Sequence, residues 1–124
     1  MLPPDLESLY TTVETLSPKA LDELPHGAIQ LDKDGKILRY NHFESALAGV
    51  SRERAIGKNF FRDVAPCTDV AQFCGRFKEG VAKKKLHEKF RYHFPFKSSP
   101  QNVLITLFYN ARSDTVWVFV QPID

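Results

Sequence analysis

Cys67 is the residue of this chain best suited to covalent chemistry, because a thiolate is a strong nucleophile. It follows Pro66, whose ring fixes the local backbone, within a segment (residues 56–69) that also holds an aromatic pair. Thr68 and Asp69 resemble the start of a helix, and the positive end of a helix dipole would favour the thiolate and its acylation. An inert surface cysteine or a small buried apolar residue are the alternatives that the residue type leaves open.

A second group of candidate residues is less specific. Cys74 lies seven positions after Cys67 on a predicted apolar helix face, which indicates a core thiol; the spacing is not that of a zinc site, and a disulfide is not expected in a reducing cytosol. Tyr40 and Glu44 are four residues apart at a predicted helix start, so both side chains can face one pocket. Equally, Tyr40 could simply end a strand and Glu44 complete a helix cap.

No arrangement typical of an enzyme accompanies these residues. The sequence shows no Ser/His/Asp order, phosphate-binding glycine loop or paired-carboxylate motif, and no metal site is predicted. The histidines are scattered, and alternation along the predicted strand places His87 and His93 toward solvent. They are His26, His42, His87 and His93. We therefore expect a protein that is not an enzyme.

The elements that must position these residues follow from local patterns. The first part of the core is predicted as two strands joined by a tight Asp-Gly turn, followed by short helices. The expected ranges are 28–32 and 37–41 for the strands, 33–36 for the turn and 51–55 for a short helix. Between the second strand and that helix, Asn41 resembles an N-cap with Glu44 in the capping-box position, and Gly49 ends the helix that Asn41 begins.

The second part of the core is predicted as a longer helix and three strands. The apolar face of that helix consists of Val70, Phe73, Cys74, Phe77 and Val81. Alternating apolar residues predict strands near residues 90–96, 103–109 and 116–120, with a turn at 111–114. The order of elements predicts an α+β domain, with a five-stranded antiparallel sheet flanked by short helices.

The first 26 residues differ in character from the rest. Leu6, Leu9, Tyr10 and Val13 have helical spacing, and Ser17-Pro18 and Pro25 interrupt the pattern. So short a helix is marginal alone and must dock on something. We therefore expect an N-terminal cap at residues 1–26 on a core at 27–124, together forming one domain.

Composition excludes several classes of partner. The chain has 124 residues and a net charge of +2, too slight to argue for nucleic acid or membranes. No apolar run approaches the ~20 residues that span a bilayer, and no signal peptide is apparent, which predicts a cytoplasmic protein. Ten Phe, four Tyr and one Trp suggest either bulky core packing or a pocket for a flat ligand.

Residues 56–69, with their Pro66-Cys67 pair, resemble the chromophore-attachment segment of the photoactive yellow proteins, small bacterial blue-light receptors built on a PAS domain. The similarity runs from about Gly27 to about Phe90 and resumes at residues 117–120. Its closest stretches are 27–32, 56–69 and 77–82. The resemblance implies a PAS fold, in which helices on one face of the sheet enclose a ligand pocket.

The resemblance also implies a chromophore, p-coumaric acid (4-hydroxycinnamic acid), bound as a thioester to Cys67. Tyr40 and a protonated Glu44 would hydrogen-bond its phenolate. Besides Pro66, the expected pocket residues are Phe60, Phe61, Phe94 and Phe96. Blue light would isomerise the double bond from trans to cis, and Glu44 would pass its proton to the phenolate. Partial unfolding of the N-terminal cap would then carry the signal from a monomer to an unknown downstream signalling protein.

Three departures from the family pattern carry expectations of their own. The family commonly has Thr where this chain has Ala48 and Arg where it has Val50, although Arg52 could substitute. Both changes should raise the chromophore pKa and give a mixed yellow and near-ultraviolet dark population. A Met that speeds recovery in some members is replaced by Ser98 or Ser99, so dark recovery is expected to be slower.

Two other functions stay open. One is a sensory or interaction module with the PAS fold that never acquires a chromophore. The other is a thiol enzyme or redox sensor that uses Cys67, although no resolving cysteine or paired histidine is obvious.

Overall fold

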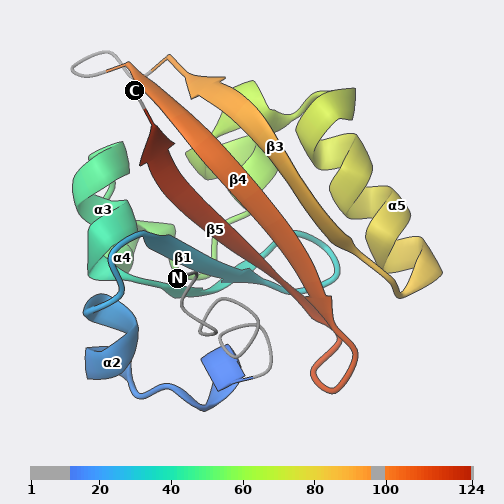
Figure 1. The fold of residues 1–124 in the computed structure, drawn as a ribbon, viewed down its shortest axis with the longest axis horizontal. Helices are drawn as coiled ribbons and strands as arrows, with labels where there is room; N and C mark the ends of the chain where they lie inside the picture. Colours follow the sequence, from blue (N-terminus) through green and yellow to red (C-terminus); the bar gives the residue numbers. More distant parts are fainter. Residues whose placement is uncertain (1–11, 96–99, 124) are drawn as a thin grey trace, which may run out of the picture.

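A five-stranded antiparallel sheet with the order β2-β1-β5-β4-β3 forms the centre of the molecule (Figure 1). The computed structural model describes residues 12–95 and 100–123. The strands are β1 (Gly27–Leu31), β2 (Ile37–Tyr40), β3 (His87–Phe94), β4 (Gln101–Asn110) and β5 (Thr115–Ile123). The predicted α+β class and sheet are confirmed, and the alternating apolar residues set the strand positions to within a few residues.

Short helices precede and connect the strands. They are η1 (Val13–Thr15), α2 (Pro18–Asp22), α3 (His42–Ala48), α4 (Arg52–Ala55), η2 (Phe60–Val64), η3 (Pro66–Thr68), η4 (Ala71–Gly75) and α5 (Arg76–Lys83). The predicted start of α3 is confirmed, because the Asn41 side chain accepts from the Glu44 N–H, and Gly49 ends the helix at φ 72°. The predicted short helix beginning after Ser51 is confirmed as α4.

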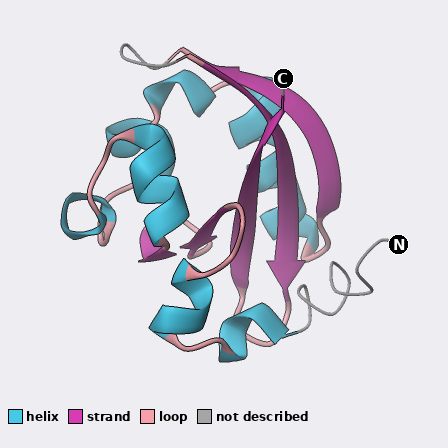
Figure 2. Ribbon diagram, turned by 60° about the vertical axis from the view of Figure 1, so that its left-hand side comes forward, coloured by secondary structure: helices cyan, strands magenta, loops and turns pink. Residues whose placement is uncertain are grey.

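The two faces of the sheet pack against different parts of the chain. Inward residues such as Ile105 and Val118 join the main core, which the helices between β2 and β3 cover. Outward residues Trp117 and Phe119 form a second, smaller cluster with Val13 of η1. In Figure 1 the helix α2 lies below α3 and the blue turn η1 lies at the lower edge of the molecule, and Figure 2 shows short helices below the lower ends of the strands. The N-terminal segment therefore packs against the opposite face of the sheet from the main core.

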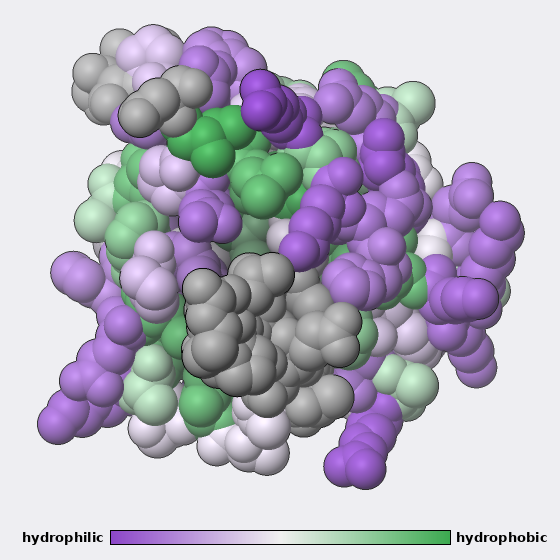
Figure 3. Space-filling model, viewed as in Figure 1, coloured by the Kyte–Doolittle hydropathy of each residue, from purple (hydrophilic) through white to green (hydrophobic). Residues whose placement is uncertain are grey.

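The surface in Figure 3 is viewed from the side of β4 and β5. Hydrophobic colour gathers over the upper part of these two strands, and hydrophilic colour over the side of the molecule that carries β3 and α5. No helix of the described ranges is long and apolar enough to cross a membrane.

One sequence prediction about a helix was wrong. The longer helix after Cys67 is split, because a π-helical turn, η4, precedes α5. Val70 lies before η4 with an extended backbone, outside the helix, and is 45% exposed. The predicted interruption at Ser17-Pro18 is confirmed, because η1 ends at Thr15 and Pro18 begins a separate helix, α2, where the Ser17 hydroxyl accepts from the Ala20 N–H at 3.1 Å. Leu6, Leu9 and Tyr10 lie outside the described residues.

Candidate functional site

Glu44 is the most unusual side chain of the main core. It lies in the first turn of α3, is 2% exposed, and its Oε1 has no hydrogen-bond partner in the part of the chain that the structure describes. Burial raises its pKa to about 8. The carboxyl does not complete the expected capping box, since the Asn41 N–H donates instead to the Ala28 carbonyl at 3.0 Å. Glu44 is therefore a protonated acid at neutral pH with hydrogen-bonding capacity unused.

Gly27 leaves the room that Glu44 occupies. A Cβ at position 27 would lie 2.1 Å from Glu44 Oε1, closer than any real contact allows. The reason for glycine here is thus space rather than a turn, since residue 27 begins β1.

Tyr40 lies at the end of β2 beside Glu44. It is 2% exposed, and burial together with the Glu44 carboxylate raises the pKa of its phenol. The electrostatic influence of Glu44 on Tyr40 indicates that the two groups share one environment, as their spacing predicted. Together they form a desolvated polar end to the main core.

Aromatic rings make up much of the main core. Phe60 and Phe61 come from η2, where Asn59 caps the turn by accepting from the N–H groups of Phe61 and Arg62. Phe73, which the sequence did not single out as a site residue, lies 5.8 Å from each of these rings and 6.5 Å from Phe94.

The predicted aromatic residues are thus brought together around Phe73. All of these rings are buried, which makes the region apolar and dry. Phe96, predicted with them, lies outside the described residues.

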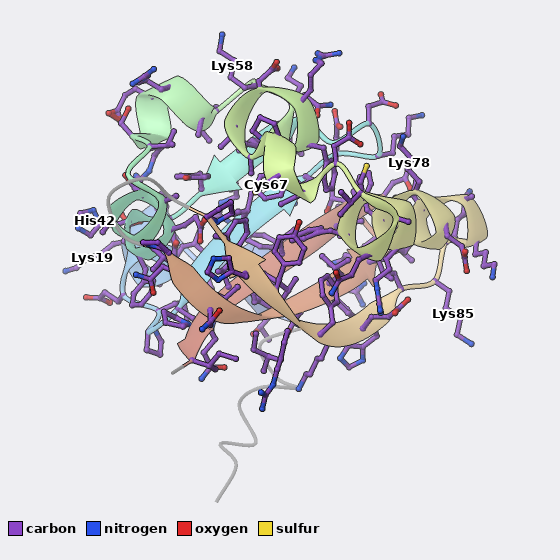
Figure 4. The ribbon with its side chains drawn as sticks, turned by 90° about the horizontal axis from the view of Figure 1, so that it is seen from above. Lys19, His42, Lys58, Cys67, Lys78 and Lys85 are labelled. Atoms are coloured by element: carbon purple, nitrogen blue, oxygen red, sulfur yellow. The ribbon has the colours of Figure 1, made fainter. Side chains whose placement is uncertain are left out.

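Cys67 lies in the middle of the short 3₁₀ turn η3, which Pro66 begins (Figure 4). The thiol is half-buried and packs against the main core, whereas Lys58, Lys78 and Lys85 lie at the periphery of the view in Figure 4. Thr68 stabilises the turn, because its hydroxyl donates to the Ala65 carbonyl at 2.6 Å.

The expectation of a thiolate at a helix start was wrong. Burial raises the pKa of the Cys67 thiol, and the 3₁₀ turn ends at Thr68 without running into a helix that could lower it. Cys74, predicted as a core thiol, is 4% exposed, and its pKa is also raised by burial.

Tyr92 is a contact of Cys67 that the sequence did not single out. Its hydroxyl donates to the Cys67 carbonyl, and its ring packs edge-on against Phe73 and Phe94 at 5.3 Å. One indication of this contact was present in the sequence: in the alternation of β3, Tyr92 lies two residues before Phe94, so both side chains point to the same face of the sheet. The phenol therefore links β3 directly to the turn that carries the thiol.

Arg52 does not lie free beside the site. Its Nε donates to the Tyr40 carbonyl at 2.9 Å, and its Nη2 forms an ion pair with Asp22 at 2.5 Å. The ion pair lowers the pKa of Asp22. The guanidinium thus binds the backbone of Tyr40, while Val50 packs against the main core as an apolar residue.

The histidines follow the predicted exposure where the sequence made a prediction. His87 and His93 are exposed on β3, and His93 Nδ1 lies 2.8 Å from the Asn102 side chain. His26, for which the sequence indicated no role, is half-buried, and burial lowers its pKa.

Comparison with known proteins gives concordant results. The profile of the PAS fold matches residues 17–123. The chain is 46% identical over 103 residues to the photoactive yellow protein of Rhodothalassium salexigens, covering 83% of this chain and 82% of the relative. It is 41% identical over 115 residues to that of Halochromatium salexigens, covering 93% and 92%.

Solved structures agree with these relatives. The photoactive yellow protein domain of the sensor histidine kinase Ppr from Rhodospirillum centenum has a TM-score of 0.87 at 42% identity, covering 90% of this chain and 98% of that domain. The PAS domain of the RpfR quorum-sensing receptor from Cronobacter turicensis has a TM-score of 0.66 at 16% identity, covering 82% and 97%, and is similar in fold alone.

Proposed function

Because the chain belongs to the photoactive yellow protein family, we propose that it is a blue-light photoreceptor that carries p-coumaric acid as a thioester on Cys67. When bound, p-coumaric acid supplies a double bond that isomerises under blue light and a phenolic oxygen that binds or releases a proton. The relatives are sensory proteins, and the solved domain comes from a sensor histidine kinase, which supports a sensory role and a signalling partner rather than catalysis.

The environment of Glu44 is the observation that carries the proposal. A carboxyl with a pKa of about 8 is protonated at pH 7 and has an O–H to donate, and its Oε1 has no partner within the described ranges. Tyr40 supplies a second O–H, because its raised pKa keeps it neutral. Two O–H donors in a dry core suit a phenolate oxygen, which would otherwise be costly to bury.

Cys67 is the proposed attachment residue. Acylation by an activated p-coumaric acid requires the thiol to lose its proton to solvent; the S–C bond then forms as the leaving group departs. Since burial raises the pKa of this thiol, we expect acylation to accelerate as the pH rises. Pro66 and the Tyr92 hydroxyl hold the turn in place during the reaction.

The aromatic residues have a supporting role in this proposal. Phe60, Phe61 and Phe94 are buried and would exclude water from the bound group, as Phe73 would also do. Phe96 stays a prediction from the sequence.

Loss of the Glu44 proton is the proposed start of the signal. A deprotonated Glu44 would be a buried carboxylate without a donor for Oε1 among the described residues, which is costly. Its helix begins at Asn41, whose Nδ2 donates to the carbonyls of Leu21 and His26 at 2.9 and 3.0 Å. Strain at Glu44 can therefore reach the N-terminal segment through one buried amide.

We propose that this segment, within the cap at residues 1–26, opens as the light signal and is recognised by a downstream signalling protein of unknown identity. The monomeric state and the cytoplasmic location stay predictions from the sequence.

The decisive experiment is an absorbance spectrum after reaction with p-coumaric anhydride, before and after a blue flash. We expect a visible band that bleaches and recovers, is absent in Cys67→Ala and is retained in the matched control Cys74→Ala. A stable adduct that absorbs only in the ultraviolet would mean that Cys67 is correct but that the site does not hold a phenolate. No adduct at all would favour a PAS module without a chromophore.

The same holo-protein tests the effect of the departures from the family. Ala48 lacks the hydroxyl of the Thr that the family commonly has at this position, and Arg52 is already bound to the Tyr40 carbonyl and Asp22. We therefore expect a raised chromophore pKa, seen as a mixture of yellow and near-ultraviolet forms in a pH titration. A single ionised form persisting into acid would contradict this expectation.

A further inference from the structure

Glu14 makes an unusually dense set of contacts on the outer face of the sheet. Its Oε1 lies 2.9 Å from Gln30 Nε2, 2.9 Å from Thr115 Oγ1, 3.1 Å from Trp117 Nε1 and 2.5 Å from Ser113 Oγ. These donors come from β1, from β5 and from the turn before β5. One carboxylate oxygen thus ties a three-residue helix to two adjacent strands of the sheet.

Besides Glu14, the helix η1 is held by two hydrogen bonds: the Thr15 hydroxyl donates to the Thr12 carbonyl at 2.6 Å, and Arg39 Nη2 donates to the Leu16 carbonyl at 2.8 Å. η1 spans Val13–Thr15 and has no side-chain cap, so it cannot persist without tertiary contacts. Val13 is fully buried in the small cluster with Trp117 and Phe119. The apolar contact and the polar anchor of η1 therefore meet at Trp117, over whose ring the Arg39 guanidinium also lies at 5.7 Å.

A second anchor holds the other end of the same segment. At α2, Asn41 donates to the Leu21 carbonyl, and the Asp22 carboxylate accepts from the His42 N–H at 2.8 Å and from Arg52. This anchor lies next to Glu44, whereas the Glu14 anchor lies on the opposite face of the sheet. A disturbance at Glu44 can release the α2 anchor without disturbing the Glu14 anchor.

We propose that Glu14 is a positioning residue that clasps η1 to the outer face of the sheet and sets how far the N-terminal segment opens. With Glu14 in place, loss of the α2 anchor leaves η1 attached and Trp117 covered. Without Glu14, loss of the α2 anchor lets the whole of residues 12–24 leave the sheet. The light-dependent part of this inference rests on the proposed photoreceptor function, but the clasp itself does not.

Hydrogen exchange of the full-length chain in the dark, with and without chromophore, tests the clasp. In Glu14→Ala we expect amides of residues 12–24 to exchange faster, on the order of tenfold, while β4 amides are unchanged. Glu14→Gln keeps an acceptor oxygen but not its charge, so it should give an intermediate increase. Glu23→Ala, an exposed carboxylate on the same segment, is the matched control and should leave exchange unchanged.

Trp117 gives an independent readout because it is the one tryptophan of the sequence. Its emission should shift to the red in Glu14→Ala, as the indole N–H exchanges a carboxylate for water, and stay unchanged in Glu23→Ala. Equal exchange in the two alanine variants would overturn the clasp, as would an increase spread evenly over β4.

Illumination separates the clasp from the photoreceptor proposal. In the holo-protein, the light-minus-dark difference in exchange of residues 12–24 should be larger in Glu14→Ala, because light then releases the α2 anchor that still holds the segment in the dark. If the dark exchange behaves as expected but neither protein responds to light, the clasp stands and the photoreceptor proposal fails.

Discussion

Two glutamates on opposite faces of the sheet show how differently one side chain can be used. Glu14 Oε1 has four donors within hydrogen-bond distance, whereas Glu44 Oε1 has none among the described residues. Donors stabilise a carboxylate, and burial without donors drives it to the neutral acid. Glu14 is therefore suited to fixing a segment in place. Glu44 is suited to holding a proton whose loss would destabilise the fold.

The pH dependence of protein stability should distinguish Glu44 from Glu14 most strongly. The folded-state pKa of Glu44 is raised from 4.5 to about 8, so the folded protein holds a proton that the unfolded chain releases above pH 4.5. Stability from this group is fully present below pH 4.5 and falls by roughly 4 kcal/mol as the pH rises to 8. In Glu44→Gln of the chromophore-free protein that loss should disappear, as measured by urea unfolding at each pH.

The control for that experiment is Glu53→Gln, because Glu53 is an exposed glutamate in the next helix. It should retain the wild-type pH dependence. A Glu44→Gln variant with the same loss of stability from pH 4.5 to 8 as the wild type would show that Glu44 is not buried as a neutral acid.

The space beside Glu44 gives the next largest effect. Gly27→Ala places a Cβ 2.1 Å from Glu44 Oε1, so the carboxyl or β1 must move, at a cost of about 1–3 kcal/mol. In a Glu44→Ala background the oxygen is gone, and the same glycine substitution should cost less. A double-mutant cycle by chemical denaturation measures this coupling, and strictly additive effects would contradict the close approach.

The isosteric substitution at Glu14 should have the opposite sign to that at Glu44. Glu14→Gln exchanges charge-assisted hydrogen bonds for neutral ones and should destabilise the protein at pH 8 by about 1–2 kcal/mol. Glu44→Gln, in contrast, should stabilise it at that pH. Both are measured by denaturant unfolding followed by circular dichroism, and a stabilising Glu14→Gln would remove the basis for the comparison.

The local parts of the site could be predicted from the sequence. Asn41 as an N-cap, Gly49 as a helix end and the parity of Phe90 and Phe94 each depend on a few neighbouring residues. The spacing of Tyr40 and Glu44 likewise predicted that both side chains lie at the same end of the main core. Such features follow from the geometry of one helix or one strand.

The parts that the sequence missed depend on distant residues. The donors around Glu14 lie from 16 to 103 positions away along the chain, and the Tyr92 hydroxyl reaches Cys67 across 25 positions. The raised pKa of Cys67 reflects how the core packs around a turn, and Val70 is exposed because the helix begins only after it, at Ala71. Tertiary packing, rather than local propensity, decided each of these.

His26 lies between the two glutamates and gives the smallest and most selective effect. Its carbonyl accepts from Asn41 on the side of Glu44, while its ring packs edge-on against Phe119, 5.3 Å away, in the cluster that also contains Val13 and Trp117. Burial lowers its pKa below the ordinary 6.5, so the unfolded chain takes up a proton more readily than the folded one. Stability from His26 is therefore present above pH 6.5 and is lost as the pH falls, the reverse of the Glu44 effect.

The two effects overlap between pH 5 and 7, and Glu44→Gln separates them. In that background we expect stability to fall on acidification from pH 7 to 5, whereas the wild type should gain stability over the same range because Glu44 dominates. Adding His26→Phe, which keeps an aromatic ring against Phe119, should flatten the remaining slope. The double variant could instead lose stability toward pH 5 as steeply as Glu44→Gln alone. That outcome would mean that a group other than the His26 imidazole takes up the proton.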